Sequence, residues 1–273
     1  MSNNPGMPGQ IPTRNVMEED FGWEVPVDTV PVPSQGKVYP SDSPLFGRES
    51  LDIYAMTAKQ EDILSSRALI RKGTVIDHLL KSCMVDQGVN PQDMLVGDRN
   101  ALMVAVRITG YGAEYNSDVT CPACGLAQRH DFNLAGLGIK RLQIEPAEPG
   151  ANIFNFTLPV TGKEVKFKFL TGRDENDITV ANERRKKSMP GLEIETSVTA
   201  RLERAIVSVD GVADQTKIAM FVNRMPARDS KALRKYMLDN EPGIDMSTWM
   251  KCAGCGESSQ ISLPIGINFF WPD

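Results

Sequence analysis

The chain of 273 residues has no long hydrophobic run and contains few histidines and cysteines. No apolar stretch approaches the roughly 18 residues of a membrane span, which excludes an integral membrane protein. The first 16 residues, MSNNPGMPGQIPTRNV, hold no apolar segment, so we expect no secretory signal. Five cysteines do not make a disulfide framework, and two histidines leave little material for imidazole-based catalysis.

The chain also has no excess of basic residues. The net charge is −5, from 30 basic and 35 acidic residues, whereas proteins that coat duplexes are normally basic, so a nucleic-acid partner is not expected. Most of the imbalance lies in residues 1–50, which hold seven acidic and three basic residues. The one basic run, Arg184 to Lys187, is interpreted as a solvated helix end, with contact to an acidic partner surface and then to nucleic acid as the alternatives.

Sequence motifs of catalysis are missing as well. There is no phosphate-binding Gly-x-x-x-x-Gly-Lys loop, no Gly-x-Gly-x-x-Gly, no Gly-x-Ser-x-Gly and no His-Glu-x-x-His. No pair of carboxylates lies in an evident apolar context. We therefore expect no enzymatic activity and no small-molecule substrate.

The two ends of the chain are rich in features suited to contacts. Residues 1–50 carry eight of the 18 prolines, which predicts an extended arm without a long helix or central strand. The arm either packs along its own domain or lies on a neighbouring subunit. Residues 269–273 form an aromatic tail, which either tucks into the core or docks on another subunit. The aromatic residues predicted to bind partners are Phe21, Trp23, Tyr39, Phe269, Phe270 and Trp271.

Residues 51–112 are predicted to form a helical subdomain. Thr57 to Gln60 is a capping-box pattern, and helices are expected over about 57–73, 74–85 and 98–110, the last capped by Asp98.

Residues 135–245 are predicted to form an inserted β-hairpin followed by helices. Strands 152–158 and 164–169 each alternate apolar and polar residues around a Thr-Gly turn. Three helical stretches are expected after them, over about 174–188, 193–208 and 214–239, the last one broken at Pro226.

The strongest chemical signal is a pair of Cys-x-x-Cys-Gly loops, Cys121-Pro-Ala-Cys124-Gly125 and Cys252-Ala-Gly-Cys255-Gly256. Four thiolates suit a tetrahedral structural zinc site, and each loop lies between strand-like runs, as in a zinc ribbon. We predict one structural zinc per chain, held by a module whose halves are residues 113–134 and 246–268. The alternatives are a thiol redox pair and two separate turns without metal.

The spacing of the loops constrains the architecture. Compact four-cysteine sites separate their pairs by about 15–20 residues, but 127 residues lie between Cys124 and Cys252. The loops meet only if the insert leaves and returns at neighbouring points. The predicted fold class is therefore α+β: a zinc-ribbon-like β module with an N-terminal helical subdomain and a hairpin-plus-helices insert.

From about residue 30 to 273 the sequence resembles the base plate protein family of T-even-like contractile-tailed phages. The resemblance rests on segments 33–40, 56–64, 95–102 and 107–115, on the cysteine pairs, and on the ending Phe-Phe-Trp-Pro272. It implies a non-enzymatic protein of the tail baseplate, in the hub or the wedge. It also implies other baseplate and tail proteins as partners, assembly in the host cytoplasm and a location in the virion.

Four functions are weighed, and the fourth, a cysteine redox enzyme, is the one that uses the thiols as a redox pair. The leading hypothesis is a structural baseplate component. The second is a baseplate assembly chaperone that is absent from the mature virion. The third is a zinc-ribbon regulator that binds nucleic acid, against which the acidic balance argues.

Overall fold

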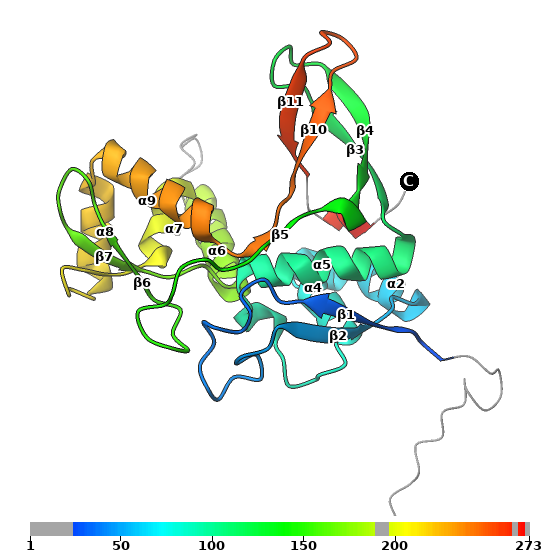
Figure 1. Ribbon diagram of the computed structural model, residues 1–273, viewed down its shortest axis with the longest axis horizontal. Coiled ribbons are helices and arrows are strands. Elements are labelled where there is room, and N and C mark those ends of the chain that lie inside the picture. Colours follow the sequence, from blue (N-terminus) through cyan, green and yellow to red (C-terminus); the bar gives the residue numbers. More distant parts are fainter. Residues whose placement is uncertain (1–23, 189–196, 264–266, 271–273) are drawn as a thin grey trace, which may run out of the picture.

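The computed structural model describes residues 24–188, 197–263 and 267–270, and Figure 1 labels its elements. The helices are α2 (Ala58–Ser65), α3 (Arg67–Lys72), α4 (Val75–Cys83), α5 (Val96–Tyr111), α6 (Gly172–Ser188), α7 (Ser197–Ala205), α8 (Gln215–Arg224) and α9 (Ala227–Asn240). Short 3-10 helices are η1 (Pro91–Asp93), η2 (Leu134–Gly136) and η3 (Ile267–Phe270).

The strands are short and form small antiparallel sheets. They are β1 (Val27–Pro31), β2 (Ser50–Tyr54), β3 (Glu114–Thr120), β4 (Ala127–Asn133), β5 (Ile139–Lys140), β6 (Phe154–Thr157), β7 (Glu164–Phe167), β8 (Ile206–Val209), β9 (Gly243–Ile244), β10 (Ser247–Lys251) and β11 (Ser258–Ser262). The pairs are β1–β2, β3–β4, β5–β9 and β10–β11, and β6–β7–β8 form a three-stranded sheet. The fold is mixed helix and sheet, which confirms the α+β class.

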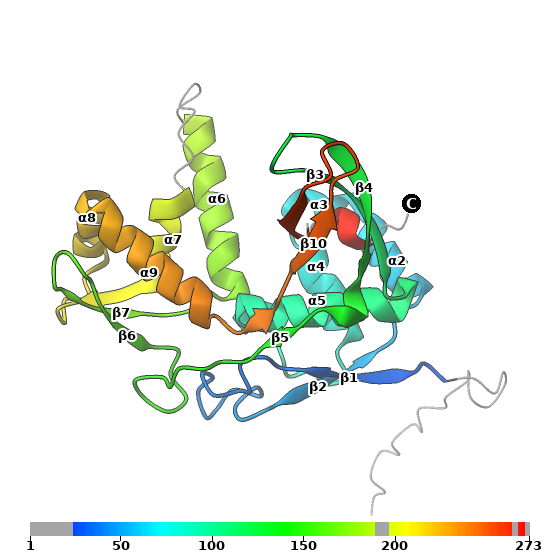
Figure 2. The same cartoon turned by 45° about the horizontal axis from the view of Figure 1, so that its top comes forward.

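Helix α5 is central to the first half of the fold. The ribbon β1–β2 lies along one side of α5, and α4 packs against it from another (Figures 1 and 2). The Thr57–Gln60 capping box forms as expected. The helix expected over 57–73 is instead two helices, because Ser66 takes an extended conformation between α2 and α3.

The described part of the arm packs on its own chain. Strand β1 pairs with β2 in the register Val30↔Leu51, so the segment predicted to begin the helical subdomain starts with a strand. Val32, Val38 and Tyr39 are buried in the main hydrophobic core, whose members run from Val30 to Phe270. Leu170, Ile178 and Ala205 form a separate small cluster. Beyond β1, burial of Val32, Val38 and Tyr39 fixes the path of the proline-rich segment.

The insert contains the expected hairpin and one strand that was not expected. Strands β6 and β7 pair through Phe154↔Phe167, and β8 adds to the far edge of β7. The helix expected over 193–208 ends at Ala205, because Ile206 to Val209 alternate buried and half-buried in β8. The last stretch divides into α8 and α9 around Pro226, as predicted.

A two-residue stem closes the insert at its base. Ile139 pairs with Ile244 and Lys140 with Gly243, and the Asp245 amide donates to the Gly138 carbonyl at 2.8 Å. Gly97 of α5 packs directly on β9, since a Cβ at Gly97 would lie 1.7 Å from the Pro242 carbonyl oxygen. The chain therefore leaves and re-enters the body at neighbouring points.

Candidate metal centre

Each cysteine loop lies at the tip of a hairpin. Strands β3 and β4 flank Cys121 and Cys124, and β10 and β11 flank Cys252 and Cys255. Figure 1 shows the two hairpins side by side above α5, with both loops at the same end. This is the strand–loop–strand arrangement that the sequence predicts, formed twice.

The backbone of each loop folds in the same way. The Gly125 amide donates to the Cys121 carbonyl at 2.9 Å, and the Gly256 amide donates to the Cys252 carbonyl at 3.0 Å. Both glycines have positive φ, 76° and 72°, which a residue with a Cβ rarely adopts. The glycine after each cysteine pair therefore sets the turn that brings two thiols together.

The four thiols form one cluster. All four Sγ atoms lie within 4.8 Å of one another, with 3.9 Å between Cys121 and Cys255 and 3.6 Å between Cys124 and Cys252. In a tetrahedron with metal–sulfur bonds of about 2.3 Å, the sulfurs are about 3.8 Å apart. A disulfide would bring two sulfurs to about 2.05 Å. The spacing thus fits a four-coordinate metal ion.

Contacts between the loops hold this spacing. The Gln128 side-chain amide donates to the Lys251 carbonyl at 3.2 Å and accepts from the Ala253 amide at 2.8 Å. Gly254 packs on Leu126, where a Cβ would lie 2.7 Å from a Leu126 methyl. The sequence does not predict the two Gln128 hydrogen bonds, because each joins residues more than 120 positions apart.

The thiols influence one another electrostatically. Backbone N–H groups of Cys255 and Gly254 lower the pKa of Cys252 to about 6. At Cys255 the Glu257 amide favours the thiolate, but partial desolvation and the neighbouring sulfurs outweigh it and raise the pKa to about 12. Ionisation of one thiol therefore disfavours ionisation of its neighbours. A dication at the centre would offset this repulsion between thiolates.

The other cysteine and the nearby histidine lie outside the cluster. Cys83 is buried on α4, where burial raises its pKa to about 11. The ring of His130 packs edge-on against Phe132 at 4.9 Å between centroids. Among the described residues, the group able to hold a metal consists of the four loop cysteines. Two of them, Cys121 and Cys252, are buried, and Cys124 and Cys255 are exposed.

Arg107 holds the start of the β3–β4 hairpin on α5. Its buried guanidinium donates to the carbonyls of Phe269, Gly112 and Glu114 at 3.0 to 3.2 Å. It thereby links α5 to the start of β3 and to η3. Reasoning from the sequence missed this role, because nothing local marks an arginine whose partners are carbonyls.

Three aromatic residues expected to bind partners are instead inside the chain. Phe269 and Phe270 are 1% and 0% exposed, and Phe269 packs edge-on against Tyr115 at 5.0 Å between centroids. Tyr39 is 5% exposed. Their apolar surface is therefore covered by the chain's own core and is not exposed for a partner in this structure. Phe21, Trp23 and Trp271 lie outside the described residues.

Tyr39 belongs to a buried polar network around Asp98. The carboxylate accepts from the Ser34 amide at 2.8 Å, the Ser34 hydroxyl at 2.6 Å and the Tyr39 hydroxyl at 2.6 Å. Tyr39 also accepts from the Leu95 amide at 2.9 Å. Burial, and then the Asp98 charge, raises the pKa of Tyr39 well above its usual value, so it stays a donor.

This network corrects the expectation that Asp98 caps the helix. Helix α5 begins at Val96 with Leu95 at the capping position, and Asp98 lies in the first turn. Its side chain turns inward to the arm instead of back to the helix amides. The network therefore fixes the arm on the N-terminal end of α5.

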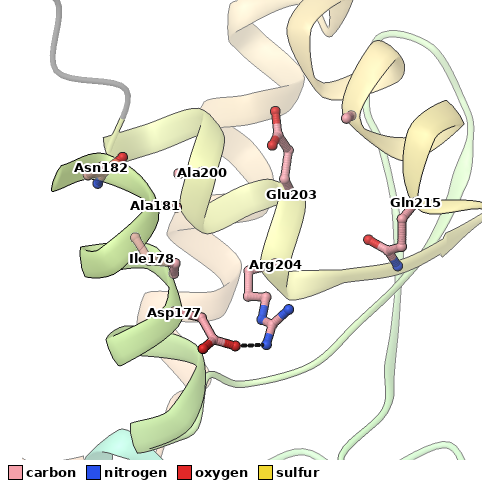
Figure 3. A pocket seen from close by; sticks show the side chains of 9 residues that line it. Asp177, Ile178, Ala181, Asn182, Ala200, Glu203, Arg204 and Gln215 are labelled. Atoms are coloured by element: carbon pink, nitrogen blue, oxygen red, sulfur yellow. Dashed lines mark hydrogen bonds and ion pairs between the residues drawn. The ribbon is translucent and has the colours of Figure 1, made fainter. Parts of the chain in front are cut away.

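An open groove of about 380 Å³ lies between α6, α7 and α8 (Figure 3). Arg204 points into it and donates to Asp177, and its Nε donates to Asp174 at 2.7 Å. The described residues that line the groove include no cysteine, histidine or serine. The groove thus presents ion-paired side chains without a nucleophile.

Comparison with known proteins gives one family. The family model described as T4 bacteriophage base plate protein matches residues 29–271. Searches of curated proteins and of solved structures gave no significant match. In the part of the chain that the structure describes, none of the helices has the length and apolar character needed to cross a bilayer.

Proposed function

The chain belongs to the T4 bacteriophage base plate protein family, and from this premise we propose that it is a structural component of a contractile tail baseplate. It acts through contacts with other baseplate and tail proteins, in the hub or the wedge, and performs no catalysis. The family implies a location in the virion tail.

The four-thiol centre is the observation that carries a structural role. Cys121, Cys124, Cys252 and Cys255 have the donor type and the Sγ spacing for zinc, and we propose one structural zinc per chain. When bound, the ion would neutralise the thiolates and join the two hairpins. A shell of four protein ligands leaves no position for water or substrate, which favours a rigid building block over an enzyme.

Metal content and stability together test this centre. We expect about one zinc per chain by elemental analysis, and none in Cys121→Ser or in Cys252→Ser. Free metal at a thousandfold above its dissociation constant stabilises a fold by about 4 kcal/mol. Stripping the ion with a strong chelator should therefore lower the melting temperature by about 8–16 °C for a chain of this size.

Cys83→Ala is the matched control, because Cys83 is the one cysteine outside the cluster. It should keep its zinc and respond to chelator as wild type does. Metal-free wild type that melts at the holo temperature would contradict a structural ion. Thiol redox turnover that Cys121→Ser abolishes without loss of stability would favour the redox alternative.

Composition of the mature particle separates a component from a chaperone. Quantitative mass spectrometry of purified virions of the phage that encodes this chain should find it at a fixed ratio to other tail proteins. Absence from virions, with presence in assembly intermediates, would instead make it an assembly chaperone. A zinc-dependent, salt-sensitive affinity for DNA or RNA would favour the nucleic-acid regulator.

A further inference from the structure

The outward face of α9 carries a row of cations that sequence reasoning did not single out. Arg228, Lys231, Arg234 and Lys235 are all exposed. At 3.6 residues per turn they occupy about a third of the helix circumference. The opposite face is buried and includes Leu233. We refer to these four cations as the α9 face.

The described part of the chain leaves most of the α9 face without ion pairs. Among the described residues, only Lys235 of the four has an ion-pair partner, Asp239, at 2.7 Å. Asp229, in the first turn of α9, is buried and accepts from the backbone amides of the turn between β6 and β7. Leu238 lies within the same face and is 68% exposed. The surface therefore suits an acidic partner that also offers an apolar group.

Such a partner is present in this sequence. Residues 18–28, EEDFGWEVPVD, hold five acidic and no basic residues. Phe21, Trp23, Val25 and Val27 alternate with other residues, so an extended chain would put them on one side. Within this segment the structure describes residues 24–28. Glu24 is exposed there and forms no ion pair with a described residue.

Glu24 and the α9 face lie near opposite ends of α5. Glu24 lies beside Thr57, at the start of α2. The neighbouring Met56 amide donates to the Thr109 hydroxyl, which places this region near the C-terminal end of α5. Helix α9 leads into β9, which packs on Gly97 near the N-terminal end of α5. Figures 1 and 2 both show β1 entering on the side away from α9.

The distance between Glu24 and the α9 face is longer than the acidic segment can span. Helix α5 has 16 residues and is about 24 Å long, and the α9 face extends farther out from its contact with β9. The six peptide steps from Glu18 to Glu24 span at most about 22 Å. The acidic segment can therefore meet an α9 face only on another molecule.

We propose that the α9 face binds residues 18–28 of a second copy of this chain. The carboxylates face the lysines and arginines, and Phe21 or Trp23 packs against Leu238. Because the two surfaces differ and lie at opposite ends, the contact is head-to-tail, which closes into a ring or continues as a filament. This goes beyond the proposed function, since it concerns copies of one chain and is independent of presence in the virion.

Charge reversal on either side tests the contact. The full-length wild type should self-associate in sedimentation velocity at about 50 mM salt, and weaken as the Debye length shortens with added salt. Lys231→Glu/Arg234→Glu/Lys235→Glu should weaken association by about tenfold or more, as attractive pairs become repulsive. Glu18→Lys/Glu19→Lys/Asp20→Lys should do the same.

A mixture of the two triple variants is the sharpest measurement. The segment variant carries a basic segment, which can pair with the acidic α9 face of the other variant. Association restored in the mixture, but in neither variant alone, supports the proposal. The control Arg67→Glu/Arg71→Glu/Lys72→Glu makes the same change of net charge on exposed cations of α3. It should associate as wild type does.

Three results would overturn the proposal. The first is a wild type that stays monomeric up to about 100 µM at low salt, a range that includes weak interfaces. The second is an equal loss of association in the α3 control. The third is binding of a DNA oligonucleotide that the α9 triple variant abolishes, which would assign the face to nucleic acid.

Discussion

Replacing Gly97 with alanine tests the close packing at the base of the insert. The new Cβ would lie 1.7 Å from the Pro242 carbonyl oxygen and 2.9 Å from the Gly243 Cα. Both are backbone atoms, so no side-chain rotation relieves the overlap. Alanine gains about 1 kcal/mol of helix propensity over glycine, whereas overpacking costs about 1–3 kcal/mol and occasionally more. Because the stem itself must move, we take the upper cost of about 3 kcal/mol, which leaves a net loss of about 2 kcal/mol.

Thermal unfolding followed by circular dichroism measures this loss. For a chain of this size, 2 kcal/mol corresponds to a melting temperature about 4–8 °C lower. Gly136→Ala is the control, because a Cβ there would meet no atom within 4 Å, and it should stay within about 0.5 kcal/mol of wild type. A Gly97→Ala protein that melts with the control would refute the approach of α5 to β9.

Two further predictions concern buried carboxylates. Tyr39→Phe removes one donor from Asp98 and should cost about 1–3 kcal/mol in urea denaturation; a strictly additive double variant with Asp98→Asn would show that the two groups do not interact. At Asp174 burial opposes ionisation, but hydrogen bonds from Lys168, the Thr171 amide and Arg204 outweigh it and lower the pKa. That stabilisation is present above the unfolded pKa of about 3.9 and is lost as pH falls through the lower folded value. Asp174→Asn should therefore be less stable at neutral pH and lose less stability on acidification than wild type, and parallel urea midpoints between about pH 3 and 6 would contradict this.

The parts of the fold that the sequence predicts correctly depend on local signals. The cysteine loops need a fixed spacing and a following glycine, and both lie within five residues. The β6–β7 hairpin depends on alternation around a turn, and the α2 cap on Thr57 and Gln60. The family resemblance is confirmed by the match over residues 29–271.

The parts that it misses depend on partners far along the chain. Strands β5 and β9 have two residues each, too few to show any periodicity. Ile206 to Val209 follow a helix without a break, and only pairing with β7 makes them a strand. Asp98 resembles a helix cap until the arm supplies its donors. The cations of α9 are scattered in sequence and gather only on the helix surface.

The two-residue stem changes the polymer statistics of the metal centre. Fourteen residues separate Cys124 from β5 and seven separate β9 from Cys252, so pairing of the stem leaves an effective loop of 21 residues in place of 127. The entropy of loop closure scales with the logarithm of length, and this shortening lowers its cost by about 1.6 kcal/mol. Once Ile139 and Ile244 have paired, four thiols that are remote in sequence come together at nearly the entropic cost of a site whose cysteine pairs are about 20 residues apart.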